Sequence, residues 1–290
     1  GADRDHHADQ QGDGRIQPLP AERQHAGAGQ HRRQRDRRIG HQVHECATLV
    51  QVVTVPFAQQ PRRAQVDQDA EVAAFVAEQT RARLLETDWV LEGGGIEVDG
   101  EGTAIVTESC VLNPNRNPGR TKAGCERALS RLLGVDKVIW LPGIAGRDIT
   151  DGHTDFYARF ARPGVVVAGL DNDPDSFDHA VTRRHRELLQ VATDARGRRL
   201  KLLMLAGPDS VRAEYESEDF AAGYINFYVC NGAVIAPEFG DGRADRNARA
   251  VLTELFPQRT IVQLNIDGIA AGGGGIHCTT QQQPKSVARS

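Results

Sequence analysis

The sequence predicts an α/β protein in which ββαβ units repeat around a shared centre, as the blades of a propeller do. Three observations predict this fold. Pairs of β-like runs are joined by turn dipeptides such as Asp99-Gly100 and Asn231-Gly232. Each pair is followed by a helix-like stretch and then by one more apolar strand. This order recurs three times in the chain, and because one unit cannot bury its own faces, the copies must pack against one another.

The three copies have the same predicted elements in the same order. The first comprises strands at Gly95–Val98 and Thr103–Thr107, a helix at Thr121–Leu133 and a strand at Lys137–Leu141. The second comprises strands at Phe156–Ala161 and Val165–Gly169, a helix capped by Asp173 with Pro174 in its first turn and extending to Thr193, and a strand at Leu200–Leu205. The third comprises strands at Tyr224–Val229 and Ala233–Pro237, a helix at Ala244–Leu255 and a strand at Thr260–Ile266. A glycine run at 272–275 then begins a fourth copy.

The repeat begins after about residue 65, and the chain therefore divides into an anomalous segment, 1–65, and a repeat domain, 66–290. Residues 1–45 are rich in His, Arg, Gln, Asp and Gly and have almost no apolar periodicity, which is typical of disorder. Within this segment only residues 47–57 form a β-like stretch. Histidine pairs such as His41 and His44 could bind a metal, but no carboxylate or cysteine pattern completes a site, and a solvated tail is the simpler interpretation.

Composition excludes several classes of function. A net charge of −4 and a pI near 6.2 give no electrostatic reason to bind DNA or RNA. No apolar run is long enough to span a bilayer, and the N-terminus lacks the apolar region of a signal peptide, so we expect a cytoplasmic protein without membrane contacts. The five cysteines are widely spread and form no C-x-x-C pair, so the sequence indicates free thiols and no zinc site.

Four polar residues stand at equivalent places, where each repeat begins its first strand: Glu92, His153, Asn226 and Cys278. Equivalent positions converge around a pseudo-axis, so these residues should line one pocket. Cys278 follows glycines that let the backbone approach a ligand closely. His153 offers an imidazole for proton transfer, and Asp155, two residues on, points to the same side in extended backbone. A buried structural cysteine and a chance His-x-Asp triplet are the alternatives.

The chain also carries four motifs, in order and at fitting distances over residues 66–285, by which it resembles the agmatine deiminases. They are Leu91–Ile96 (LEGGGI), Leu112–Pro118 (LNPNRNP), Thr150–Asp155 (TDGHTD) and Gly273–Gln282 (GGGIHCTTQQ). The resemblance implies a five-bladed, pentein-type ββαβ propeller of the guanidine-modifying superfamily, shared with bacterial-type peptidylarginine deiminases. It also implies hydrolysis of agmatine to N-carbamoylputrescine and ammonia, a step of putrescine and polyamine biosynthesis, without a metal or organic cofactor. A homodimer is a further expectation from the resemblance.

The family pattern, carried over to matching positions, makes Cys278 the nucleophile, His153 the general acid and base, Asp155 a clamp on the guanidinium and Glu92 an acidic residue that orients the histidine. Glu92 could instead accept backbone N–H bonds in a turn. We interpret Asp151 as a turn-forming residue. We leave Asn226 out of the catalytic set, because its segment also reads as an ordinary strand.

One departure bears on activity. Agmatine deiminases carry a Trp-x-Arg-Asp-x-Gly-Pro motif before the Glu-Gly-Gly segment, and its aspartate is a second clamp on the guanidinium. This chain has no such motif, so the first blade is expected to be incomplete or replaced. A catalytically impaired relative with a cation-binding pocket is therefore an alternative, and a deiminase acting on another guanidine, such as peptidylarginine, is another.

Overall fold

The computed structural model describes residue 72, residues 74–85 and residues 87–282. The predicted segment 1–65, its β-like stretch and the boundary near residue 65 lie outside this part of the chain.

Three small sheets of three strands each form the framework of the described residues. In every sheet the middle strand pairs antiparallel with the first strand and parallel with the third. The first sheet contains β1 (Ile96–Val98), β2 (Thr103–Thr107) and β3 (Lys137–Leu141). The second contains β4 (Ala158–Arg162), β5 (Val165–Leu170) and β6 (Lys201–Ala206), and the third contains β7 (Tyr228–Cys230), β8 (Ala233–Glu238) and β9 (Thr260–Asn265). The repeated ββαβ unit predicted from the sequence is therefore confirmed for three copies.

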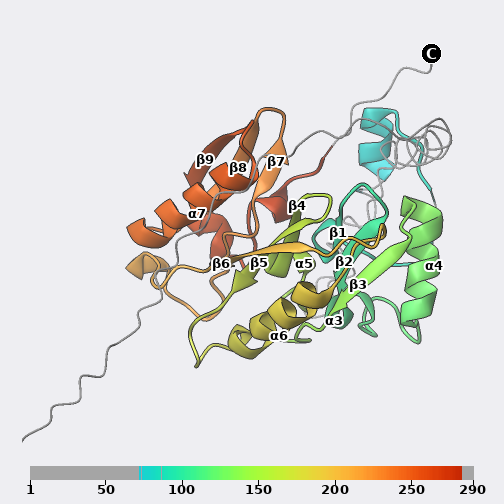
Figure 1. The fold of residues 1–290 in the computed structure, drawn as a ribbon, viewed down its shortest axis with the longest axis horizontal. Helices are drawn as coiled ribbons and strands as arrows, with labels where there is room; N and C mark the ends of the chain where they lie inside the picture. Colours follow the sequence, from blue (N-terminus) through green and yellow to red (C-terminus); the bar gives the residue numbers. More distant parts are fainter. Residues whose placement is uncertain (1–71, 73, 86, 283–290) are drawn as a thin grey trace, which may run out of the picture.

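One long helix follows the middle strand of each sheet and lies on the periphery of the protein (Figure 1): α4 (Lys122–Leu133), α6 (Asp178–Val191) and α7 (Gly242–Leu255). Thr121 caps α4 by accepting a hydrogen bond from the Gly124 N–H. Asp241 caps α7 in the same way. The short elements are η1 (Gly93–Gly95), α3 (Glu108–Val111), α5 (Thr154–Tyr157), η2 (Ala213–Tyr215), α8 (Asp267–Ala270) and η3 (His277–Thr279).

Two groups of predicted boundaries are wrong. Helix α6 begins at Asp178, because the Asp173 carboxylate accepts a hydrogen bond from the Asp175 N–H and forms a turn instead of a helix cap. We call the first strand of each repeat its inner strand. The inner strands β4 and β7 begin later than predicted. Phe156 lies in the helical turn α5, and Tyr224–Phe227 form turns before β7.

A buried ion pair joins the first strands of the three repeats. Arg159 Nε on β4 lies 2.6 Å from Glu97 Oε2 on β1, and the Phe160 N–H donates to Glu97 Oε1 at 3.0 Å. The same guanidinium donates to the Phe227 carbonyl, 2.8 Å away, next to β7. Both side chains are buried, so each charge depends on the other for compensation. This pair fixes the three inner strands beside one another, and with them the loops that precede each strand.

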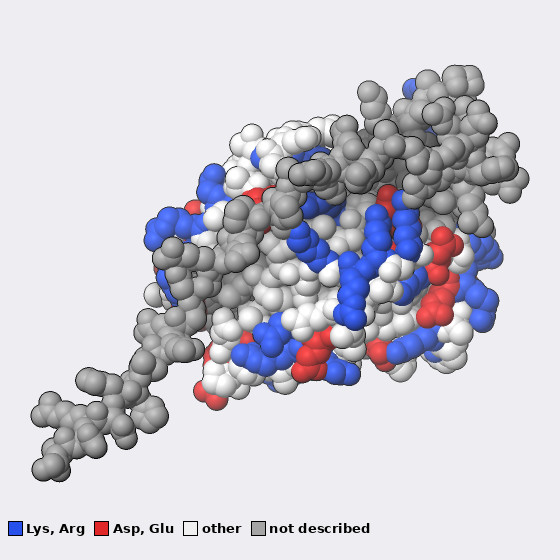
Figure 2. Space-filling view, in the orientation of Figure 1, with Lys and Arg blue, Asp and Glu red and all other residues white. Residues whose placement is uncertain are grey.

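Charges of both signs lie alongside one another on the face of the molecule shown in Figure 2. Within the described residues, every helix is too short or too polar to cross a membrane.

We predict that Arg159→Met destabilises the fold by about 3–5 kcal/mol, because it leaves Glu97 buried and unpaired. Arg184→Met, which removes an exposed ion pair with Glu187 on α6, is the matched control and should change stability by less than about 1 kcal/mol. Urea unfolding followed by circular dichroism measures both. Equal losses for the two variants would show that the central pair does not hold the strands together.

Candidate functional site

The loops that precede the inner strands bring the four predicted site residues together. Glu92 comes just before η1, His153 and Asp155 stand at the start of α5, and Cys278 lies in η3. His153 Nε2 is 3.2 Å from Glu92 Oε2, and Cys278 Sγ is 3.8 Å from Asp155 Oδ2. The element η1 contacts both α5 and η3. Residues from three separate motifs thus form one cluster.

Asn226, left out of the sequence-based set, belongs to the same cluster. Its side chain is fully buried, and its Nδ2 lies 3.4 Å from Cys278 Sγ. Its Oδ1 accepts a hydrogen bond of 2.8 Å from the His277 N–H. Gly275 is required here, since a Cβ at that position would lie 2.2 Å from Asn226 Oδ1. The signal that finds Asn226 is its place at the start of the third repeat.

The Asp155 carboxylate is buried, with 1% of the residue exposed. Its Oδ2 is 2.7 Å from His277 Nδ1, whereas Oδ1 is buried without a hydrogen-bond partner among the described residues. An unpaired carboxylate oxygen in such surroundings costs free energy unless a ligand pairs with it. Asp155 can therefore hold a cationic N–H group beside the sulfur of Cys278.

From the sequence, an extended backbone at His277 would turn its ring away from the neighbouring Cys278 and give it a packing or indirect role. The backbone is instead a 3-10 turn, and the ring binds the Asp155 carboxylate. His277 therefore fixes one of the carboxylate oxygens and leaves the other free.

Gly94 lets the backbone approach His153 and Asp155 closely. A Cβ built on Gly94 would lie 2.6 Å from His153 Nδ1 and 2.7 Å from Asp155 Oδ2. Both side chains therefore pack against the backbone at this position, which only glycine fits without a shift of one of them. By contrast, a Cβ on the neighbouring Gly93 would meet nothing within 4 Å.

Arg116 stands behind this cluster and links two carboxylates. Its Nε is 2.6 Å from Glu92 Oε1, and its Nη1 is 2.7 Å from Asp151 Oδ2. Burial opposes ionisation of Glu92, but the adjacent His153 and Arg116 outweigh it and hold the pKa of Glu92 below its ordinary value. Asp151 also accepts a 2.8 Å hydrogen bond from the Gly146 N–H, in agreement with its predicted role in a turn. Sequence analysis missed Arg116, because the motif around it reads as a rigid loop.

The thiol of Cys278 is in its protonated form near neutral pH. Burial of the sulfur and, next, the negative charge of Asp155 raise its pKa to about 11, although the residue as a whole is exposed. The hydrogen bond from Asn226 opposes this shift. A cation bound to Asp155 would remove part of the repulsion and favour the thiolate.

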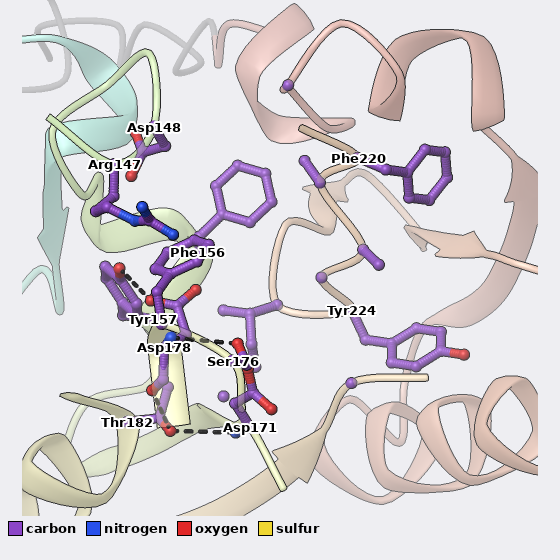
Figure 3. A pocket seen from close by; sticks show the side chains of 18 of the residues that line it. Arg147, Asp148, Phe156, Tyr157, Asp171, Ser176, Asp178, Thr182, Phe220 and Tyr224 are labelled. Atoms are coloured by element: carbon purple, nitrogen blue, oxygen red, sulfur yellow. Dashed lines mark hydrogen bonds between the residues drawn. The ribbon is translucent and has the colours of Figure 1, made fainter. Parts of the chain in front are cut away.

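A pocket of about 820 Å³ adjoins the cluster, and His153 forms part of its wall. Figure 3 shows its acidic and aromatic lining, which includes Asp148, Asp178, Phe156 and Phe220. Burial raises the pKa of Asp178 to about 6, even though the Tyr157 hydroxyl donates a 2.8 Å hydrogen bond to it. The pocket therefore favours a ligand that carries positive charge and apolar groups.

The chain is similar to a known protein family and to named relatives. Residues 39–284 match the family model described as Porphyromonas-type peptidyl-arginine deiminase. A Streptomyces coelicolor protein provisionally named an agmatine deiminase is 44% identical over 224 residues, which cover 76% of this chain and 66% of that protein. An agmatine deiminase of Pseudomonas fluorescens is 40% identical over 235 residues, which cover 75% of this chain and 64% of that protein.

A solved structure has the same fold. The agmatine deiminase of Enterococcus faecalis superimposes with a TM-score of 0.71 at 36% identity, over 76% of this chain and 65% of that one. The chain thus spans just under two thirds of the length of these relatives.

We predict that iodoacetamide modifies Cys278 slowly at pH 8, since a thiol with a pKa of about 11 is only about 0.1% ionised there. The rate should rise steadily up to pH 11. Asp155→Asn removes the neighbouring negative charge, lowers the thiol pKa and raises the rate at pH 8 several-fold. Peptide mass spectrometry measures the modification, and Asp194→Asn, at a buried carboxylate that pairs with Arg198, is the control. A rate that Asp155→Asn leaves unchanged would argue against the observed contact.

Proposed function

This chain belongs to the Porphyromonas-type peptidyl-arginine deiminase family, and we propose on that premise that it hydrolyses the guanidinium group of agmatine to N-carbamoylputrescine and ammonia. The observation that carries the proposal is the buried Asp155 carboxylate, whose Oδ1 is unpaired among the described residues and whose Oδ2 lies 3.8 Å from the Cys278 sulfur. A planar cation with several N–H donors matches this arrangement.

In the first half of the proposed reaction, Asp155 binds two N–H groups of the substrate and places the guanidinium carbon against Cys278. The bound positive charge favours loss of the thiol proton, and His153 accepts it. The thiolate attacks the guanidinium carbon and forms a carbon–sulfur bond. His153 then returns the proton to the departing nitrogen, so that ammonia leaves and a thiouronium stays on Cys278.

In the second half, water attacks the thiouronium carbon, and His153 removes a proton from that water. The carbon–sulfur bond breaks, the thiolate takes the proton held by His153, the remaining hydroxyl proton passes to solvent as the C=O bond forms, and the carbamoyl product is released. Glu92 contacts His153 through Oε2, while Oε1 pairs with Arg116. Both oxygens being engaged, Glu92 orients the histidine and does not hold the substrate. Nδ1 of His153 lies on the opposite side of the ring from this contact, toward Gly94.

The missing tryptophan-containing motif bears on how well the enzyme works. Agmatine deiminases hold the guanidinium with a second aspartate, and Asp155 alone would leave the cation less firmly oriented. We propose an active enzyme whose turnover is reduced by this loss. A relative that binds the cation without turnover is the competing possibility, and thermal stabilisation by agmatine without ammonia release would favour it.

The size of the pocket beyond His153 favours a second candidate substrate. Its volume of about 820 Å³ lies in the range that holds drug-sized ligands, roughly 300–1,000 Å³, and exceeds what the short chain of agmatine needs. Peptidylarginine or another long guanidine would use more of this space.

We also propose that the three sheets are blades of a five-bladed pentein propeller and that residues 66–290 constitute the deiminase domain. The superposition on the Enterococcus faecalis enzyme supports this arrangement. A cytoplasmic location and a homodimer stay predictions.

Substitution of Cys278 tests the chemistry directly. We predict that the parent protein releases ammonia and N-carbamoylputrescine from agmatine and that Cys278→Ala releases neither. Asp155→Asn should lower kcat/KM by at least about 100-fold, since it removes a charge-assisted contact to the reacting group. Ammonia release from peptidylarginine at a higher kcat/KM would identify the second candidate as the substrate. Turnover that survives in Cys278→Ala would refute the mechanism.

Gly94→Ala gives a second prediction, matched by Gly93→Ala. The new Cβ at position 94 would displace the His153 ring or the Asp155 carboxylate from their observed positions, so kcat/KM should fall by about 100-fold or more. The Cβ at position 93 meets nothing, and that variant should retain activity within a few-fold. Steady-state assays and thermal unfolding of both variants provide the measurement. Similar activities for the two variants would contradict the roles given to His153 and Asp155.

A further inference from the structure

A thiol that the proposed reaction does not use lies directly behind the catalytic histidine. Cys110, on α3, is buried, with 1% of the residue exposed, and its Sγ is 3.6 Å from Glu92 Oε2. His153 Nε2 is 3.2 Å from that same oxygen. The three donor atoms, from Cys110, Glu92 and His153, all lie within 4.8 Å of one another. Cysteine, histidine and carboxylate are the ligand types that zinc uses in proteins.

From this juxtaposition, we propose that Glu92, Cys110 and His153 form a binding site for a thiophilic divalent cation, with zinc as the best fit, and that the bound ion inhibits the enzyme. Tetrahedral zinc has bonds of about 2.0 Å to nitrogen and oxygen and about 2.3 Å to sulfur, which place neighbouring ligands roughly 3.3–3.5 Å apart. The observed separations of 3.2 and 3.6 Å agree with that geometry. The ion would take three protein ligands and leave a fourth position for water.

One feature besides the grouping of the donors indicates a ligand. His153 is nine-tenths buried, and its Nε2, 3.2 Å from Glu92 Oε2, makes no hydrogen bond in the described part of the chain. Gly95 packs against the three side chains. A Cβ there would be 3.1 Å from Cys110 Sγ, 3.6 Å from Glu92 Oε2 and 3.7 Å from the His153 ring.

The surrounding charges are suited to a dication. Arg116 pairs with Oε1 of Glu92, so that Oε2 faces Cys110 and His153, and the charge of Arg116 is shared with Asp151. With Cys110 bound as a thiolate, the two carboxylates and the sulfur balance the guanidinium and a divalent ion. Because ligands must lose their protons, binding would release the Cys110 proton to solvent.

Inhibition rests on the proposed function, whereas metal binding does not. A zinc ion on Nε2 would fix His153 in its unprotonated, metal-bound form and would take Glu92 from its orienting role. The histidine could then neither accept nor return a proton at the substrate. Cys278 is not a ligand, so its sulfur would stay free.

Cobalt and zinc titrations of the full, untagged chain test the proposal. Cobalt(II) chloride should produce a thiolate-to-cobalt charge-transfer absorption, and one equivalent of zinc chloride should abolish it. Cys110→Ser should lose this absorption and weaken zinc binding more than about 100-fold, since loss of an outer-shell partner alone costs roughly 10- to 100-fold. Cys46→Ser, Cys125→Ser and Cys278→Ala serve as thiol controls and should keep the absorption.

A second variant guards against misfolding of Cys110→Ser. Gly95→Ala retains all three ligands but brings a Cβ to 3.1 Å from the Cys110 sulfur, which must shift, so it should weaken zinc binding, whereas Gly93→Ala should not. With zinc bound, iodoacetamide should still modify Cys278, and a chelator should restore turnover of agmatine. If the absorption persists in Cys110→Ser, or disappears in Cys278→Ala, the proposed site is wrong. The spectroscopic result decides this even if agmatine is not hydrolysed.

Discussion

The burial of charged groups is the constraint on which the centre of this protein depends. Ionised side chains removed from water need partners of opposite charge or hydrogen bonds, and these partners must come from other repeats. Glu97 and Arg159 join the inner strands of the first and second sheets, and the same arginine reaches the third repeat through the Phe227 carbonyl. Because this ion pair fixes the inner strands, it also fixes the loops that precede them. These loops carry the reactive side chains.

Two chains of polar contacts follow from this constraint and divide the site into two halves. One extends from Asp151 through Arg116 and Glu92 to His153, and it fixes the base. The other extends from His277 to Asp155 and Cys278, and Asn226 connects the sulfur with the backbone of His277. The backbone of Gly94 lies against both halves, at His153 and at Asp155.

In the proposed mechanism, the contact between Asp155 and Cys278 makes the nucleophile selective for cationic substrates. The thiol has little tendency to ionise while Asp155 stands alone beside it. A guanidinium supplies the positive charge that both the carboxylate and the developing thiolate require, so the reactive form arises where the substrate is bound. Close packing also places Cys110 beside Glu92 and the base His153, where a thiophilic metal ion could bind it.

Sequence patterns predict most of the framework but only part of the site. The middle and outer strands and helix α4 follow from apolar runs, turn dipeptides and caps, which are local signals. The starts of β4 and β7 do not, because the chain turns at Phe156 and Tyr224 to position side chains at the centre, against the strand propensity of the segment. Arg116 and the contact between His277 and Asp155 depend on packing between repeats, which spacing along the chain does not reveal. The convergence of Glu92, His153 and Cys278 is the exception, because the repeat itself makes their positions equivalent.

The most direct test of the central claim is a rapid-quench experiment with agmatine, read by mass spectrometry of the peptide that contains Cys278. We expect this peptide to gain the mass of agmatine less ammonia and to lose it again as N-carbamoylputrescine appears. Turnover without any such adduct, or an adduct on a different cysteine, would contradict the account.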